Sequence, residues 1–201
     1  AFAPIVIASV FGTILSRIWF GDFPAFEVPG HHITSFLEFP AFVILGGVCA
    51  VAAVALMRVA AFVEVQGQRL PLPRWLHPAL AGLVVGLVAL EFPEILGVGY
   101  EAMDGALNEV EGYGLELMLP LAVLKILMAA LCLGAGFGGG VFSPSLFIGA
   151  MIGGAYGIVA AIPFPDLASG HGAYTLIAMG AVAAATLGAP ISTILMIFEM
   201  T

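Results

Sequence analysis

The residues best suited by type and spacing to bind a ligand lie in one short stretch, 138–149, which reads GGGVFSPSLFIG. Glycines at 136 and 138–140 permit an unwound or left-handed backbone, and Pro144 suits the first turn of a new helix. The amides of Val141 and Phe142 come just before that turn, where no intrahelical acceptor is expected. A helix N-terminus with unpaired N–H groups attracts anions. The predicted anion site is therefore built from backbone and comprises Gly140, Val141, Phe142, Ser143 and Pro144.

Such a site suits an anion that must pass rather than stay. A full positive charge would hold the anion too tightly, whereas partial charges bind it and release it. A second interpretation is that the glycines only let helices pack closely, because glycine is frequent in membrane helices. The coincidence of a glycine run, a proline and a continuing apolar helix favours the anion site.

The composition places this stretch in a membrane protein. Of the 201 residues, 62% are hydrophobic and 9% are charged, and the mean hydropathy is +1.15. Soluble domains carry roughly a quarter of their residues as charged side chains. The formal net charge of -8 argues against a nucleic-acid partner, because few basic side chains could neutralise phosphates.

Apolar stretches long enough to cross a bilayer must position the glycine run. A spanning helix needs about 20 apolar residues, which predicts crossings at 1–20, 39–63 and 75–90 and two longer tracts at 117–165 and 167–198. Glycine and proline clusters should divide each long tract, giving about seven helices or half-helices. The predicted fold class is all-α, polytopic and transmembrane, with broken and re-entrant half-helices. Irregular backbone at membrane depth lines cavities or is buried in protein, so the breaks are the expected functional positions.

Charged residues predict an orientation. Arg58, Arg69 and Arg74 surround the connection between the second and third crossings, and an excess of basic residues marks the cytoplasmic side. The acid-rich stretches 21–38 and 91–116 are then outside, and we interpret 91–116 as a solvated connection rather than a cation site. His31 and His32 lack a third ligand at a suitable spacing, so we predict no metal site.

Several other residues have more than one interpretation. Lys125 is the only charge in its tract and could raise the potential near an anion path, reach a membrane surface or pair with a carboxylate. We expect Glu199 to be an interfacial cap or packing contact and Tyr156 to belong to the core or an interface. Four-residue spacing predicts close helix packing at two sets of glycines: Gly149, Gly153 and Gly157, and Gly82 and Gly86.

Enzymatic functions find no support in the sequence. HExxH, GxSxG, paired membrane aspartates and GxxxxGK are all absent, so we expect neither an enzyme nor a bound cofactor. Two alternatives to an inorganic anion pathway stay open. One is a secondary transporter of organic anions with broken helices, and the other is a non-transporting membrane scaffold or assembly subunit.

Two separate motifs resemble the CLC family of chloride channels and chloride/proton antiporters. Residues 140–144, GVFSP, match the family's GxFxP signature, and residues 188–201, GAPISTILMIFEMT, resemble its helix that ends in EMT. The order and spacing of the intervening segments also fit. The resemblance implies a fold of antiparallel repeated halves and a homodimer with an ion pathway in each subunit. It also implies that the amides of Val141 and Phe142 contact a permeating chloride.

The resemblance further implies that residues 1–201 are a partial CLC-like transmembrane domain, most of the second inverted repeat. The family's GSGIP stretch, its G(K/R)EGP stretch with the gating glutamate and its pore tyrosine match nothing in this sequence. Channels and antiporters of the family differ in residues that this sequence does not contain, so both activities stay open. We expect an integral, multi-pass protein of the cell membrane, with chloride and the lipid bilayer as its partners.

Overall fold

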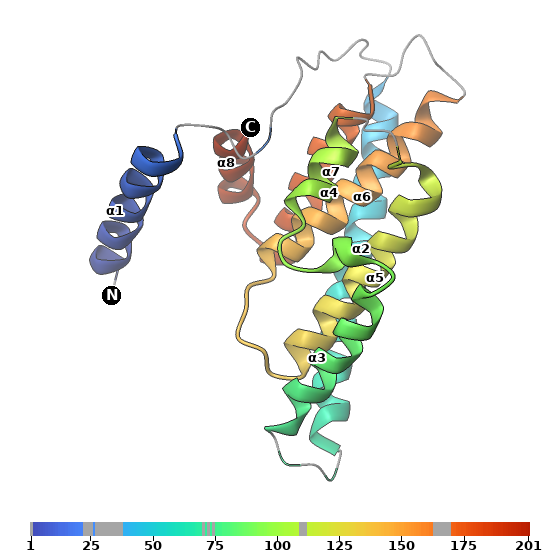
Figure 1. The fold of residues 1–201 in the computed structure, drawn as a ribbon. Helices are drawn as coiled ribbons and strands as arrows, with labels where there is room; N and C mark the ends of the chain where they lie inside the picture. The colour runs from blue at the N-terminus through green and yellow to red at the C-terminus, as the bar shows by residue number, and fades with distance from the viewer. Residues whose placement is uncertain are drawn as a thin grey trace.

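The structure is a computed structural model that describes residues 2–21, 26, 38–69, 71, 73, 75–108, 112–162 and 170–201. Within these residues the chain forms eight α-helices and the short 3₁₀ helix η2, with no strand (Figure 1). In chain order they are α1 (Phe2–Phe20), α2 (Phe39–Arg69), α3 (Leu76–Ala89), η2 (Pro93–Ile95), α4 (Tyr100–Leu107), α5 (Leu115–Gly134), α6 (Phe142–Ala161), α7 (Gly170–Leu187) and α8 (Pro190–Met200). Five of them, α1, α2, α5, α6 and α7, are long and apolar enough to cross a membrane. The predicted all-α membrane fold is confirmed.

The predicted breaks in the two long apolar tracts are confirmed. The first tract divides into α5 and α6, and residues 135–141 between them are not helical. Gly136 lies in the left-handed region with φ 90°, which an L side chain rarely adopts. The second tract divides into α7 and α8, and Pro190 is the first residue of α8, where a proline costs no hydrogen bond.

The acid-rich stretch 91–116 is more than a solvated connection, so that prediction was wrong in part. It contains α4, whose apolar residues Ala102, Met103, Ala106 and Leu107 are at most 2% exposed. These four residues share one helical face, which packs into the same core as Leu146 of α6. Glu91, Glu101 and Glu116 are exposed, as expected for a stretch that also meets solvent.

Close packing at the glycines of α6 is confirmed. A Cβ added at Gly149 would lie 2.5 Å from the Ala178 carbonyl oxygen, and one at Gly153 would lie 2.5 Å from the Tyr174 carbonyl oxygen. Gly157 approaches the backbone of α7 in the same way. These three glycines therefore let α6 and α7 meet backbone to backbone.

Among the described residues, the same prediction does not hold for the glycines of α3. A Cβ at Gly82 would make only an ordinary contact, 3.7 Å from the Phe137 ring, and one at Gly86 would meet nothing within 4 Å. Both residues are exposed because no described helix covers that face of α3. A glycine spacing predicts packing only where a second helix is present.

The end of α2, which carries arginines, and the start of α5 lie toward opposite ends of the bundle. α2 ends and α3 begins at the lower end in Figure 1, whereas α5 begins and α6 ends toward the upper end. Arg58 and Arg69 are exposed in the C-terminal part of α2. Which end faces the cytoplasm stays a prediction. Predictions for His31, His32 and Arg74 fall outside the described residues.

Candidate functional site

The predicted anion site lies where α6 begins, partway along the bundle (Figure 1). Val141 precedes the helix with φ -87° and ψ -8°, and Phe142 is the first helical residue. The Ser145 amide donates to the Val141 carbonyl at 3.1 Å and closes the first turn. Within the described part of the chain, the amides of Val141, Phe142 and Ser143 have no hydrogen-bond acceptor. Several N–H donors are thus available at one helix N-terminus.

The glycine loop before these donors is open and exposed. Gly138, Gly139 and Gly140 are exposed, and a Cβ added to any of them would meet nothing within 4 Å. Val141 and Phe142 are half-buried. Among the described residues the loop is therefore not a close helix contact, in contrast to the glycines later in α6. The packing interpretation of the loop glycines finds no support here.

Ser145 fixes the first turn of α6 from its buried side, and the sequence analysis missed this role. Its side chain is fully buried, and its Oγ donates to the Phe142 carbonyl oxygen at 2.6 Å. Ser145 Oγ is therefore engaged with the helix backbone, whereas Ser143 is half-buried beside the unpaired amides. The sequence did contain a signal, because Ser145 in the first turn is followed directly by two apolar residues, Leu146 and Phe147, which the structure buries.

Lys125 neither reaches a surface nor pairs with a described carboxylate. It is only 4% exposed, and its Nζ donates to the carbonyl oxygens of Ile95 at 2.8 Å and Gly97 at 3.0 Å. The same Nζ lies 4.4 Å from the centroid of the Phe147 ring on α6. Snorkelling and carboxylate pairing, two of the three interpretations of this residue, are therefore wrong for the described part of the chain.

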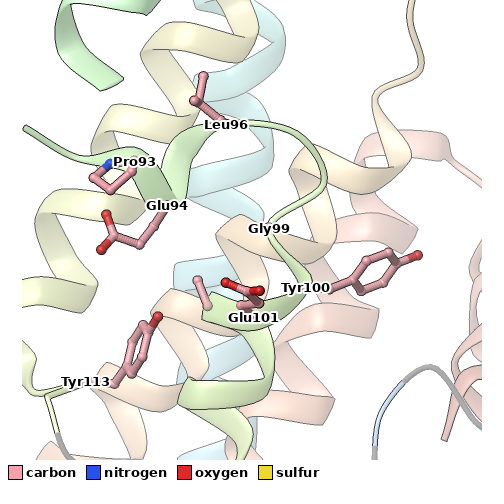
Figure 2. Close-up of a pocket in the computed structure, with 8 residues that line it drawn as sticks. Pro93, Glu94, Leu96, Gly99, Tyr100, Glu101 and Tyr113 are labelled. Carbon is pink, nitrogen blue, oxygen red and sulfur yellow. The ribbon is translucent and has the colours of Figure 1, made fainter. Parts of the chain in front are cut away.

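A separate pocket lies beside the start of α4, and its charged side chains are acidic, in contrast to the N–H donors at the start of α6. Figure 2 shows Glu94, Glu101 and the Tyr113 hydroxyl around it, and its volume is about 370 Å³. Burial raises the pKa of the Tyr113 phenol, and the two glutamates raise it further. Two carboxylates disfavour an anion in this pocket. No three His, Cys, Asp or Glu side chains gather as a metal site in the part of the chain that the structure describes.

Two tyrosines, one on α6 and one on α7, hydrogen-bond to residues at the start of α2 and just before it. Tyr156 donates from its hydroxyl to the Ala41 carbonyl at 2.9 Å, which confirms its expected place in the core. Tyr174 is 2% exposed and donates to Glu38 Oε1 at 3.2 Å. The hydrogen bond between Tyr174 and Glu38 was not predicted from the sequence. Glu199 is exposed near the end of α8.

Comparison with known proteins gives one consistent answer. The family described as voltage gated chloride channel matches residues 1–201. Chloride channel protein CLC-e of Arabidopsis thaliana is 32% identical to this chain, over 98% of the chain and 30% of its own length. The H(+)/Cl(-) exchange transporter ClcA of Vibrio cholerae is 32% identical over 98% of the chain and 42% of its own length.

A third relative comes from another bacterium. The putative chloride channel protein ClcB-like of Ralstonia nicotianae is 33% identical over 98% of this chain and 46% of its own length. The chain therefore spans less than half the length of each of these three relatives. It belongs to the voltage-gated chloride channel family.

Proposed function

We propose that these residues form part of a membrane protein that transports chloride, and that the amides of Val141 and Phe142 hold the anion. The observation that carries this proposal is the set of N–H groups at the start of α6 that have no acceptor among the described residues, next to an exposed glycine loop. Membership of the family and the names of the relatives support chloride as the anion. They do not favour an organic anion or a scaffold role.

The proposed mechanism uses backbone dipoles alone. A chloride that has lost water is met by N–H groups whose combined dipole amounts to about half a positive charge. The described cation nearest in sequence, Lys125, is occupied by two carbonyls and a ring. Binding is then strong enough for entry and weak enough for release. In this mechanism the half-buried ring of Phe142, on the residue whose amide binds the anion, shapes the constriction.

The complete protein supplies the remainder of the pathway. We propose that residues 1–201 contribute most of the second repeat and that the complete protein is a homodimer in the cell membrane. The resemblance to the CLC family supports both statements. The apolar window of α1 is 0% buried within this chain, so its side chains are available to lipid or to other protein segments.

Anion flux from liposomes that contain the complete protein tests the proposed function. We expect efflux of chloride and little efflux of a small carboxylate from the same vesicles. Selective carboxylate flux would instead identify an organic-anion transporter. The absence of any flux would favour a scaffold.

Phe142→Ala in the complete protein is expected to change chloride turnover several-fold, because the half-buried ring borders the unpaired amides. Stopped-flow chloride efflux from liposomes measures the change. Tyr156→Ala serves as the control. It removes the hydrogen bond to the Ala41 carbonyl and should lower the free energy of unfolding by about 1–3 kcal/mol while leaving flux per folded protein intact. Wild-type flux in Phe142→Ala would contradict the proposed role of the ring.

A further inference from the structure

The buried ammonium of Lys125 joins three elements that are far apart in sequence. It extends from α5, donates to the carbonyls of Ile95 and Gly97 and lies 4.4 Å from the centroid of the Phe147 ring. An ammonium has three donors, and a ring face also attracts a cation. Two carbonyl dipoles and the ring therefore surround this charge, with no carboxylate beside it among the described side chains.

The Phe147 ring is held from a second direction by backbone. Gly99 lies in the left-handed region with φ 80°, and a Cβ added there would lie 2.5 Å from Phe147 Cδ2. The backbone before α4 therefore touches the ring directly, and only glycine permits this approach. The ring itself is 0% exposed. We call Ile95, Gly97, Gly99, Lys125 and Phe147 the Lys125 clamp.

The clamp lies on the same helix as the proposed anion site. Phe147 follows Phe142 by five residues within α6, and both rings belong to one packed cluster that also contains Ile95. The clamp thus holds the buried side of α6, at whose start the amides have no acceptor among the described residues and the adjoining glycine loop is exposed. Small displacements of a binding group are costly, because a shift of about 1 Å can reduce a rate about a hundredfold.

We propose that Lys125 is a positioning residue that sets the chloride affinity of the α6 amides by clamping Phe147. This inference rests on the proposed function. In this role Lys125 acts through the position of Phe147 and does not attract the anion directly with its charge. Disturbing Phe147 leaves that charge in place and still weakens chloride binding.

Isothermal titration of chloride into the purified complete protein tests the proposal. Lys125→Met, which removes the donors and the charge, should weaken chloride binding about tenfold, and Phe147→Leu should weaken it about fivefold. Because both changes release the same contact, the double variant should be no weaker than about tenfold. Lys125→Arg keeps the charge and N–H donors but puts a larger planar group into a buried site, so its chloride affinity should fall between those of the wild type and Lys125→Met. Phe62→Leu, at a 63% exposed phenylalanine of α2, is the matched control and should bind as the wild type does.

The outcomes separate this inference from the proposed function. If the wild type binds chloride and Phe147→Leu binds it equally well, the positioning role is overturned. Multiplicative losses in the double variant would overturn it too, because they would show two independent effects. If the wild type binds no chloride, the proposed function fails and this inference fails with it. Should Lys125→Met not fold, Phe147→Leu and Lys125→Arg decide the question.

Discussion

Replacing Val141 by proline is expected to weaken chloride binding to the complete protein about tenfold to a hundredfold, because one amide donor to a charged ligand is lost. The substitution should destabilise α6 only slightly. Val141 has φ -87°, near the value that proline fixes, and its amide has no acceptor among the described residues. Gly140 before it has no Cβ to clash with the new ring. Isothermal titration with chloride measures the affinity.

Val141→Ala is the matched control for this substitution. It also loses side-chain atoms, but it keeps the amide, so we expect chloride affinity close to that of the wild type. Equal affinities in Val141→Pro and Val141→Ala would show that this amide does not bind the anion. Melting temperatures measured without chloride identify any variant whose fold is damaged.

The largest expected effect on stability follows from Gly153→Val. A Cβ at this position would lie 2.5 Å from the Tyr174 carbonyl oxygen and 2.6 Å from Thr175 Cα. Both atoms belong to the backbone of α7, so the whole helix must move and the core between α6 and α7 must open. We expect the free energy of unfolding to fall by at least about 3 kcal/mol. Thermal unfolding in detergent and the monodisperse fraction after size exclusion measure the loss.

Gly86→Ala provides the comparison for this variant. It also adds a Cβ to a helical glycine, but nothing lies within 4 Å of that position. Its melting temperature should equal or slightly exceed that of the wild type, because alanine favours a helix by about 1 kcal/mol. A wild-type melting temperature in Gly153→Val would contradict the backbone contact between α6 and α7.

Local features of the fold could be predicted because their causes are local. Glycine and proline interrupt helices wherever they cluster, which placed the breaks before α6 and α8. The unpaired amides at Val141 and Phe142 follow from the same break, since every helix start leaves donors without partners. Close packing of α6 followed from glycine spacing on a single helix face.

Features that depend on distant segments could not be predicted. Lys125 binds carbonyls 28 and 30 residues away, and carbonyls leave no mark in a sequence. Tyr174 reaches Glu38 across 136 residues. In α4 the acidic residues dominated the composition of the stretch, although four apolar residues on one face already indicated a buried helix. The exposed glycines of α3 show the reverse error, because their spacing indicated a neighbour that no described helix provides.

A structure of the complete protein in bromide, with its anomalous signal recorded, tests the central claim most directly. Bromide replaces chloride and marks its own position. We expect an anomalous peak within hydrogen-bonding reach of the amide nitrogens of Val141 and Phe142, in the open space beside the glycine loop. Bromide bound only elsewhere, with these two amides donating to protein acceptors, would contradict a backbone anion site at the start of α6.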